Sequence, residues 1–423
     1  MTASHSYRSV DPLARKAFWT TFAGFSIDAM SVQVVAFLLP ALSFLWSISP
    51  TRAGMLASAA LASGSIGGWL AGSVSDRIGR IAVLRITILW LGISSALCGL
   101  AQTYDQLLLA RLVQGFGFGA EWSVGVVFIS EIAPRTTRGR TLGSLQSAWA
   151  VGWGLAAATT SIALALVPPA IAWRIVLFVG LLPALAIAGL RTRMIEPPIF
   201  PAGDAPLPWY RIFGRDARWK TLKGCALATG THGGYWAIAT WWPTMLRLER
   251  GLSPPATTLH MAVLVGGSFL GYLLAAWLSD RVGRRATLVS FAAAGAVVAL
   301  AATQLSLSDA ALLLLTAALG LFALGLYSAL GPVLTESYPT ALRGSGLGFC
   351  YNMGRGLAGA TPVAVGTSVA ALGYAHAIGL YVAMSYTLVV LATAALRETR
   401  AVDLVRVAEL GGAERPNTIS APR

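Results

Sequence analysis

The stretch GWLAGSVSDRIGR at residues 68–80 decides the fold, because a close copy of it, YLLAAWLSDRVGRR, recurs at residues 272–285. The aspartates of the two copies, Asp76 and Asp280, stand 280 − 76 = 204 residues apart, which is nearly half of the 423-residue chain. A motif that recurs after half the chain indicates two duplicated halves.

A second pair of motifs repeats in the same order. SEIAPRTTRGR at 130–140 contains Glu131, and TESYPTALRG at 335–344 contains Glu336, with 336 − 131 = 205. Duplicated apolar halves that run in the same direction are typical of membrane transporters, in which the substrate site lies between the repeats. The repeats therefore predict that the chain moves a solute across a membrane.

The composition is that of a protein that crosses a membrane many times. Hydrophobic residues make up 56% of the chain, charged residues only 11%, and the mean hydropathy is +0.68. Because roughly 20 apolar residues cross the bilayer core, we predict an all-α integral membrane protein with about twelve transmembrane helices. Their expected centres lie near residues 30, 64, 91, 118, 153, 181, 233, 268, 294, 322, 357 and 385.

These helices are expected to form two pseudo-symmetric six-helix bundles joined by a polar, proline-rich linker. The predicted parts are a cytoplasmic N-terminal segment at 1–16, an N-terminal bundle at 17–190, the linker at 191–221, a C-terminal bundle at 222–397 and a cytoplasmic tail at 398–423.

Basic residues set the expected orientation, since Lys and Arg are retained on the cytoplasmic side of a membrane. With both termini inside, most of the 31 Lys and Arg residues fall in cytoplasmic segments. This topology, together with attraction to anionic membrane lipids, accounts for the net charge of +14 without a nucleic-acid partner.

The sequence carries no pattern for an enzyme, a cofactor or a metal. It has no P-loop, no HExxH sequence and no nucleophile beside a suitable base. Cys98, Cys225 and Cys350 stand singly in apolar runs, where cysteine is typically a small packing residue. Transport without a nucleotide site must be driven by a gradient.

The loop from Gly72 to Arg80 resembles the signature between helices 2 and 3 of the major facilitator superfamily, and residues 280–285 match its echo between helices 8 and 9. The resemblance covers essentially the whole chain. It implies transport by alternating access and a functional monomer. It also implies that the protein lies in the inner membrane of a bacterium. YWAIATWWPTML at 235–246 and GLGFCYNMGRGLAG at 346–359 resemble the bacterial metabolite/proton symporters, which include sialate, aromatic-acid and monocarboxylate carriers.

A conformational gate is expected at the cytoplasmic end. Tight turns need glycine where φ is positive or helices approach closely, and an Asp flanked by Arg can hold a helix N-terminus and then release it. By resemblance, Asp76 faces the segment near Arg343. The second copy has Ala276 in place of Gly72, which makes close helix approach less certain there. The predicted gate comprises Gly72, Asp76, Arg77, Gly79, Arg80, Glu131, Asp280, Arg281, Gly283, Arg284, Arg285, Glu336 and Arg343.

The alternative for the gate is that its arginines only fix the topology of the chain.

Proton coupling should depend on ionisable groups inside the spans, because a charge at mid-bilayer is costly. Asp28 lies about 12 residues into the first helix, hence about 18 Å deep, and its neighbours Ile27 and Ala29 do not neutralise it. His232 occupies the equivalent position in the second half, since 232 − 28 = 204, and imidazole titrates near neutral pH. A structural, hydrogen-bonded Asp28 and a packing His232 are the alternatives.

Glu121 and Arg355 are the other mid-depth charges. Arg355 either pairs with Glu121 or Asp28 at rest, or binds an anionic substrate bidentately; the two readings are compatible, and Glu121 alternatively only joins helices. Arg111, near the outer end of its span, either snorkels to the surface or takes part in coupling, as RLVQG at 111–115 implies by its resemblance to the superfamily's helix 4 motif.

Substrate binding is assigned to side chains at the same depth. Amides within hydrocarbon need partners, and aromatic rings suit an aromatic or aliphatic acid. The predicted substrate-binding residues are Arg355, Asn352, Tyr351, Gln146 and Trp236; Trp122, Trp149, Trp153, Tyr235 and Trp241 are further candidates for lining the cavity.

The sequence thus favours proton-coupled uptake of a small organic anion by alternating access of two bundles. Proton-driven efflux of a drug or metabolite is the alternative, although the span at 148–170 lacks the central proline common in efflux members of the superfamily. A non-transporting membrane sensor is a remote third reading, because neither linker nor tail is large enough to fold as an output domain.

Overall fold

The computed structural model describes residues 12–47, 50–134, 136–196 and 208–400. All regular structure within these residues is helical. The N-terminal half contains α1 (Pro12–Trp46), α2 (Pro50–Ile78), α3 (Arg80–Leu100), α4 (Tyr104–Gly117), α5 (Ala120–Ile132), α6 (Arg138–Gln146), α7 (Ala148–Leu166), α8 (Pro169–Val179) and α9 (Leu181–Arg191). The C-terminal half contains η1 (Trp209–Phe213), α10 (Arg218–Leu248), α11 (Pro254–Val282), α12 (Arg284–Gln304), α13 (Asp309–Leu319), η2 (Gly320–Leu324), α14 (Tyr327–Glu336), α15 (Thr340–Ala358) and α16 (Thr361–Ala394).

In the described residues these helices make twelve membrane-crossing segments. Only short interruptions separate α4 from α5, α6 from α7, and α8 from α9, so each pair forms one membrane-crossing segment. The π-helical turn η2 connects α13 to α14 in the same way. Gly373, with φ 76°, divides α16, so that residues 361–372 continue α15 and residues 374–394 form the last segment. Each expected centre falls within one of these segments, which confirms the predicted twelve-helix architecture.

Length and apolar composition alone identify eight candidate spans in the described residues. The last of them, Ala341–Ala394, is 54 residues long and crosses twice, since Gly373 breaks it. The other three segments are α1, α2 and α10.

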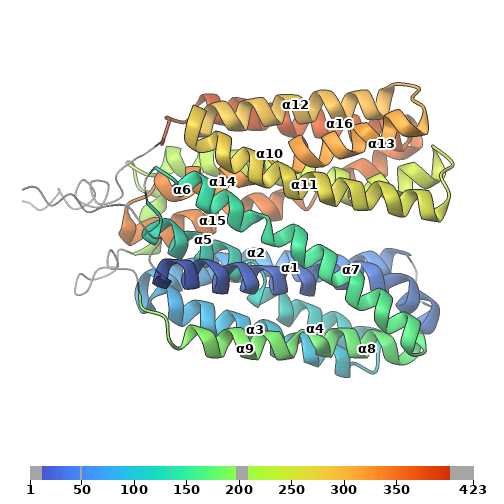
Figure 1. Ribbon diagram of the computed structural model, residues 1–423, viewed down its shortest axis with the longest axis horizontal. Coiled ribbons are helices and arrows are strands. Elements are labelled where there is room, and N and C mark those ends of the chain that lie inside the picture. Colours follow the sequence, from blue (N-terminus) through green and yellow to red (C-terminus); the bar gives the residue numbers. More distant parts are fainter. Residues whose placement is uncertain (1–11, 48–49, 135, 197–207, 401–423) are drawn as a thin grey trace, which may run out of the picture.

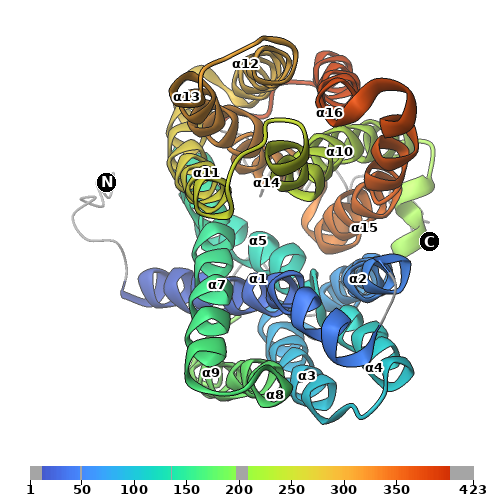
Figure 2. The same cartoon turned by 90° about the vertical axis from the view of Figure 1, so that its right-hand side faces the viewer.

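The two halves lie side by side: α1, α3, α4, α8 and α9 are in the lower part of Figure 1 and α10–α13 and α16 in the upper part, while α6 reaches up to contact α14 and α11 of the other half. The α2–α3 and α11–α12 turns, which hold the repeated motif, lie at the left of Figure 1, at the end from which the linker and the tail leave. We call this the linker end, and the opposite end, seen face-on in Figure 2, the far end.

The two repeated turns have the same backbone geometry. Gly79 has φ 100° and ψ 158°, and Gly283 has φ 101° and ψ 163°, a region that is essentially restricted to glycine. A carboxylate follows each half and caps the helix after the turn. Glu196 accepts hydrogen bonds from the backbone N–H groups of Arg80 and Ile81, and Glu398 from those of Arg284 and Arg285.

Partial burial acts to raise the pKa of Glu398, but the N–H groups of Arg285, Arg284, Arg400 and Thr399 outweigh it and hold that pKa below its usual value. The capping carboxylate is therefore ionised at neutral pH.

The halves meet closely along α2 with α15, and along α6 with α11 and α14. A Cβ on Gly72 would overlap the backbone oxygen of Gly344, so only glycine fits this crossing. At the equivalent crossing Ala276 faces Gly143, where an added Cβ would overlap that of Ala276. Close approach is thus kept in the second copy, because the glycine stands on the partner helix.

The linker begins later and ends earlier than expected. Arg191 is the last residue of α9 and is fully buried, and α10 begins at Arg218 rather than at residue 222. Arg191 remains helical because its guanidinium has a buried partner, described below. The other domain boundaries stay predictions.

We expect Gly79→Ala to destabilise the protein by about 1–3 kcal/mol, because an alanine there must adopt a disfavoured backbone conformation and its Cβ would lie 2.5 Å from Glu196 Oε1. The unfolding temperature of the purified protein in detergent measures this loss. Gly154→Ala is the matched control, since a Cβ there meets no atom within 4 Å. An equal unfolding temperature for G79A and G154A would contradict the expectation.

Candidate functional site

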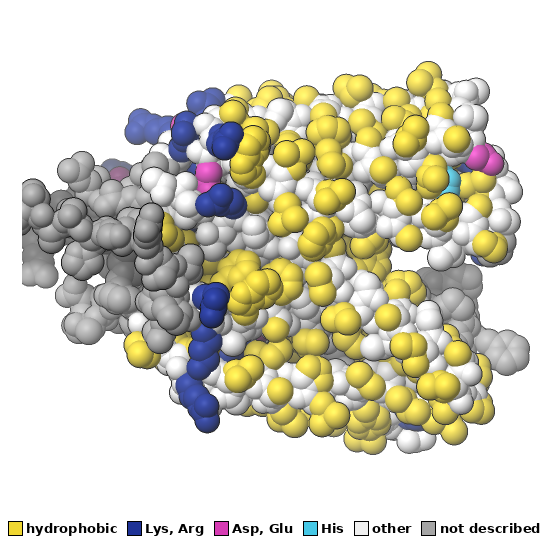
Figure 3. Space-filling view, viewed as in Figure 1, with side chains coloured by type: hydrophobic (Ala, Val, Ile, Leu, Met, Phe, Trp, Pro, Cys, Tyr) yellow, Lys and Arg dark blue, Asp and Glu magenta, His cyan; other side chains and the backbone are white. Residues whose placement is uncertain are grey.

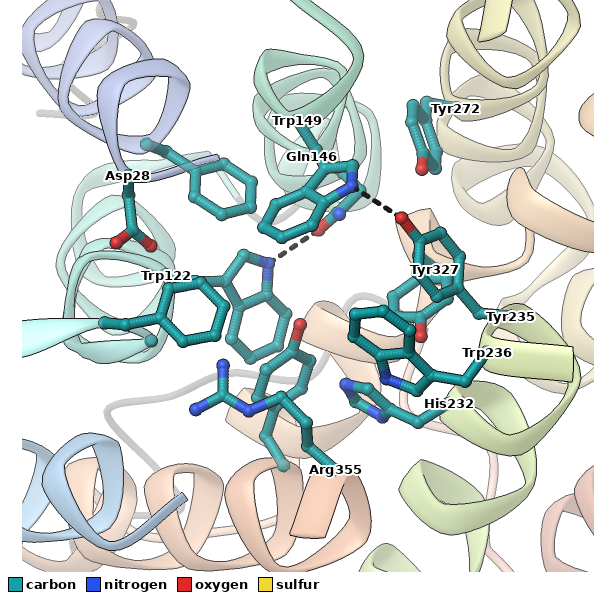
Figure 4. Close-up of a pocket in the computed structure, with 14 residues that line it drawn as sticks. Asp28, Trp122, Gln146, Trp149, His232, Tyr235, Trp236, Tyr272, Tyr327 and Arg355 are labelled. Atoms are coloured by element: carbon teal, nitrogen blue, oxygen red, sulfur yellow. Dashed lines mark hydrogen bonds between the residues drawn. The ribbon is translucent and has the colours of Figure 1, made fainter. Parts of the chain in front are cut away.

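A pocket lies at mid-depth between the two halves (Figure 4). Its envelope measures about 420 Å³, but its free space is only about 20 Å³, room for about one water molecule. It is lined by Phe25, Asp28, Phe118, Gly119, Trp122, Gln146, Trp149, His232, Tyr235, Trp236, Tyr272, Tyr327, Tyr351 and Arg355. The pocket is therefore aromatic and closely packed, with one acidic and one guanidinium group.

The helix break between α4 and α5 shapes the N-terminal wall. Gly119 has φ 81°, and α5 begins directly after it, so the N-terminal end of α5 faces the pocket. The break recurs in the second half at η2, since 322 − 118 = 204. Interrupted helices near the midplane are typical of transporter sites, because their free backbone groups can serve a ligand or an ion.

Asp28 is fully buried on α1. Neither of its carboxyl oxygens accepts a hydrogen bond of normal geometry from the described residues. The backbone N–H of Gly119 still interacts with the carboxyl group, so the alternative of a structural, hydrogen-bonded aspartate stays a prediction. An unpaired carboxylate is costly in such a place, so this position suits a group that gains and loses a proton.

Arg355 lies across the pocket on α15 and is 4% exposed. Its Nη2 donates to Asn352 Oδ1 at 2.6 Å, while Nε has no partner in the described residues. The guanidinium carbon lies 4.3 Å from the centre of the Phe118 ring, and a Cβ on Gly119 would overlap Nη2. No ion pair joins Arg355 to a carboxylate in the described part of the chain, which leaves the Nε edge of the guanidinium open to an anion.

Asn352 orients Arg355 and joins the halves. Its Nδ2 donates to Ser123 Oγ on α5 at 3.0 Å and to the Gly348 carbonyl at 2.8 Å. All of its hydrogen-bonding groups thus have protein partners, so Asn352 positions the guanidinium rather than presenting a free amide.

His232 on α10 shares the pocket with Asp28, as the repeat spacing indicates. Its Nδ1 lies 2.8 Å from the Ala228 carbonyl, which can only accept, so Nδ1 carries a hydrogen. Nε2 has no partner among the described residues and is an acceptor in the neutral ring. The ring also contacts Tyr351, with centroids 4.5 Å apart. His232 is therefore packed against an aromatic ring while its Nε2 stays open to a hydrogen-bond donor.

Two aromatic contacts close the pocket from opposite halves. Trp122 stacks on Tyr351 with ring centroids 3.5 Å apart, and Trp149 Nε1 donates to the Tyr235 hydroxyl at 3.1 Å. Gln146 accepts from Trp122 Nε1 at 2.6 Å and so fixes that ring. Room for a ligand requires these contacts between the halves to separate.

Of the other aromatic candidates, one lines the pocket and two lie outside its lining. Trp236 lines the pocket, and its Nε1 has no partner within the described part of the chain. Trp153 and Trp241 are not in the lining; Trp241 donates instead to the Pro362 carbonyl. Phe118, Tyr272 and Tyr327 line the pocket without having been singled out, because nothing in the sequence distinguishes a pocket aromatic from a packed one.

Glu121 does not pair with Arg355 or Asp28 but with Arg191. The two oxygens of Glu121 accept from Arg191 Nη1 at 2.8 Å and Nη2 at 2.7 Å, and Thr87 donates to the same carboxylate. Both side chains are fully buried. Of the alternatives for Arg355, a pairing with Glu121 is not made in this structure, because Arg191, which the sequence places in the linker, binds both Glu121 oxygens.

Arg111 does not snorkel, since it is fully buried. Its guanidinium donates to Gln114 Oε1 at 2.5 Å and, at 3.4 Å each, to the carbonyls of Ser31 and Leu56. Arg111 of the RLVQG sequence thus joins α4 to α1 and α2, and Gln114 of the same sequence holds its guanidinium in place. Arg111 lies outside the pocket lining.

A linker-end latch is formed by the repeated motifs. Asp76 accepts from the backbone N–H groups of Gly344 and Ser345 at 3.0 and 2.7 Å, at the start of α15. Asp280 accepts from those of Gly139 and Arg140 at 2.9 and 2.6 Å, at the start of α6. Each carboxylate of one half therefore binds backbone N–H groups in the first two turns of a helix of the other half, near the end where the helix dipole favours negative charge.

Buried ion pairs support both caps. Arg80 binds Asp76 at 2.6 Å and Glu131 at 3.1 Å, and Arg343 of the other half binds Glu131 at 2.7 Å. The second copy repeats this arrangement. Arg284 binds Asp280 at 2.8 Å and Glu336 at 3.0 Å, while Arg138 lies 3.4 Å from Glu336.

Not every predicted gate residue takes part in the latch. Arg77 and Arg281 are exposed, and Arg281 packs over the Trp277 ring. Arg285 donates to the carbonyls of Thr393 and Ala394 within its own half. Arg138 was missed, although the repeat could have revealed it, since 343 − 138 = 205.

The described residues contain no group of side chains suited to hold a metal ion.

Comparison with known proteins settles the family. The model of the Major Facilitator Superfamily matches residues 21–360 and, in a second alignment, residues 225–409. The chain belongs to the major facilitator superfamily.

Relatives within the superfamily are transporters. The chain is 34% identical over 407 residues to a probable 4-methylmuconolactone transporter of Cupriavidus pinatubonensis, covering 95% of each protein. It is 29% identical over 362 residues to the cis,cis-muconate transport protein of Acinetobacter baylyi, covering 83% of this chain and 86% of that one.

The fold matches the structure of the proton:xylose symporter XylE with a TM-score of 0.80 at 18% identity, over 94% of this chain and 99% of that one. This superfamily member is therefore a multi-pass membrane transport protein and not an enzyme.

We expect Asp76→Asn combined with Asp280→Asn to open the linker end, because each change removes a charged acceptor that caps a helix of the opposite half. A hydrogen bond to a charged group contributes about 1.5–3 kcal/mol. Spin labels attached through the substitutions Arg85→Cys and Lys220→Cys, in a background that lacks the three native cysteines, should report longer distances. Asp105→Asn, which changes an exposed far-end carboxylate, is the control; unchanged distances in the double variant would refute the latch.

We expect Arg191→Met to lower stability by about 3–5 kcal/mol, since it leaves Glu121 buried without its partner. Glu121→Gln combined with Arg191→Met should recover much of that loss, because no unpaired charge remains. Unfolding temperatures in detergent test both statements. Retained transport in the double variant would identify the pair as structural, whereas loss of transport in a stable double variant would give Glu121 a part in coupling.

Proposed function

We propose that this transporter carries out proton-coupled uptake of a small, flat organic anion, with Arg355 binding the substrate carboxylate and Asp28 carrying the proton. The observation that carries the proposal is the placement of these two buried and opposite charges in one pocket, with no ion pair between them in the described residues.

Arg355 is suited to a carboxylate because a guanidinium offers a planar fork of donors. Asn352 holds one arm of the fork. The Nε edge has no partner in the described part of the protein, so a carboxylate there would satisfy a buried donor. The ring of Phe118 below the guanidinium and Gly119 beside it limit the approach to one side.

The remaining walls suit a flat, unsaturated or aromatic body. Trp122, Trp149 and Tyr351 present ring faces or edges, and ring systems favour stacked or edge-on contacts with such a ligand. At the other side of the pocket His232 Nε2 and Trp236 Nε1 lack partners among the described residues. A substrate with a second polar group, such as a hydroxyl, a lactone oxygen or a ring nitrogen, would satisfy them.

The named substrates of the relatives fit this description. 4-Methylmuconolactone and cis,cis-muconate are small unsaturated organic acids or their lactones. We infer the same substrate class for this chain rather than either compound.

Charge balance gives a reason for proton coupling. With Asp28 and Arg355 both ionised, the empty pocket is neutral, and a bound monoanion adds one negative charge. A proton on Asp28 restores neutrality, which matters because net charge at mid-membrane is costly. One monoanion and one proton therefore cross together most readily, whereas a dicarboxylate such as muconate would need a second proton for the same balance. Glu121 and Arg111 carry no proton in this scheme, since each is already bound by partners within the protein.

The structure corresponds to one state of the proposed cycle. Hydrogen bonds and ion pairs between the halves lie at the linker end and at mid-depth. The basic-residue distribution favours a cytoplasmic linker end, so this state is closed toward the cytoplasm with a contracted pocket. Alternating access would then exchange this latch for contacts at the far end.

The decisive test is uptake into proteoliposomes of labelled muconate, muconolactone, benzoate and a neutral sugar, with and without an inward proton gradient. We expect gradient-stimulated uptake of an acid. Asp28→Asn should abolish accumulation but retain exchange of substrate across the membrane, because the proton carrier alone is lost. Arg355→Ala should weaken substrate affinity by roughly 10–100-fold, the worth of a charged hydrogen bond, with Arg355→Lys intermediate.

Asp105→Asn and Arg247→Ala, both exposed positions toward the far end, are the matched controls. Uptake that persists in Arg355→Ala at unchanged affinity would exclude this site. Gradient-driven export of the same acids from inverted vesicles, without uptake, would assign the protein to the efflux class.

A further inference from the structure

A second and larger cavity lies at the linker end, outside the central pocket. Its volume is about 1180 Å³. We call it the α1–α11 groove, because the start of α1 forms one wall and two residues of α11, Phe269 and Leu273, reach it from the other half. Residues at the end of α5, along α6 and after α9 complete it.

The rim of the groove is basic. Arg15, Lys16, Arg140 and Arg193 line it, and all but the half-buried Lys16 are exposed. Two carboxylates also reach it, but both are bound elsewhere: Glu131 by Arg80 and Arg343, and Glu196 by backbone N–H groups of α3. The free charge of the rim is therefore positive.

The floor of the groove is apolar and aromatic. Phe18, Trp19 and Phe22 of α1 contact one another, with ring centroids 5.3 to 6.0 Å apart, and Trp19 is 57% exposed. Phe128, Phe269 and Leu273 continue this surface. Figure 3 shows basic side chains gathered at the linker end beside hydrophobic side chains that lie between the two halves.

The geometry points to a binding site for an anionic phospholipid in the α1–α11 groove. The phosphate would bind the basic rim and the acyl chains would cover the aromatic floor, as basic pockets between membrane helices do on the cytoplasmic side. A soluble anion would use the rim but leave the floor exposed. A zwitterionic lipid would cover the floor but bring no net charge to the rim.

The segments of the chain next to the groove carry too little negative charge to match the basic rim. Residues 1–11 contain one Arg and one Asp, and residues 197–207 contain one Asp and no other charge. Neither segment supplies the concentrated negative charge that four basic side chains favour. Charge complementarity therefore selects a lipid headgroup as the occupant.

Such a lipid would act on the transport cycle, because its apolar floor is complete only while α11 lies against the N-terminal half at the linker end. All of the lining except Phe269 and Leu273 belongs to the N-terminal half. Separation of α11 from α1 and α6 would remove these two apolar residues from the floor and weaken its contact with the acyl chains. Anionic phospholipid therefore stabilises the state that is closed at the linker end.

The test compares the full-length protein with the variant Arg15→Gln, Lys16→Gln, Arg193→Gln in nanodiscs of phosphatidylcholine with or without phosphatidylglycerol. Native mass spectrometry measures retained phosphatidylglycerol. We expect selective retention by the unaltered protein, and a loss of about fivefold for each removed charge, which corresponds to about 1 kcal/mol per basic residue near a membrane surface. Spin labels at positions 85 and 220 should show a larger closed fraction with phosphatidylglycerol only when the rim is intact.

A charge-matched control separates the groove from the general attraction of a basic surface. Arg211→Gln, Arg215→Gln, Arg218→Gln removes three exposed basic residues from the same end, outside the groove. Equal loss of phosphatidylglycerol in both triple variants would overturn the proposal, as would equal retention in all three proteins. Retention that appears only after deletion of residues 2–11 would assign the groove to the chain's own N-terminal segment.

Discussion

The structure depends on one interaction made twice: a carboxylate of one half accepting backbone N–H groups at the start of a helix in the other half. Asp76 makes it with α15 and Asp280 makes it with α6. The N–H groups that Asp280 binds, those of Gly139 and Arg140, are among the groups that the first turn of α6 leaves unsatisfied. Those that Asp76 binds lie one turn further along α15, at Gly344 and Ser345. Glycines at the crossings, Gly72 and Gly143, allow the backbones to come close enough for this. The central pocket is contracted in the same state because the halves are held together.

Much of the fold and of the contacts at the linker end could be predicted from the sequence, because each motif in one half can be compared with its copy in the other half. The spacing of 204 or 205 residues places Asp76 with Asp280, Glu131 with Glu336, and Asp28 with His232. Hydrophobic runs give the twelve segments, since the bilayer fixes their length. The positive φ at Gly79 and Gly283 follows from the need for a tight turn.

The sequence does not specify which buried charges meet. Arg191 stands in a polar stretch that reads as linker, yet its long side chain reaches back into the bundle to Glu121. Arg111 stands near a span end, which suggests an exposed guanidinium, but three partners from α1, α2 and its own helix hold it inside. Such pairings depend on helix rotation and tilt, which hydrophobic patterning does not determine. The aromatic lining was recognised only in part for the same reason.

The equivalent positions of Asp28 and His232 have a consequence for recognition. The scaffold has two halves of similar fold, but the groups at this matched pair differ. One is an acid, and the other is an imidazole whose Nδ1 hydrogen is bound to the Ala228 carbonyl. With a single guanidinium on one side as well, the cavity has a fixed polarity. A ligand with two unlike ends therefore enters it in one orientation, although the surrounding fold would look almost the same after a half turn.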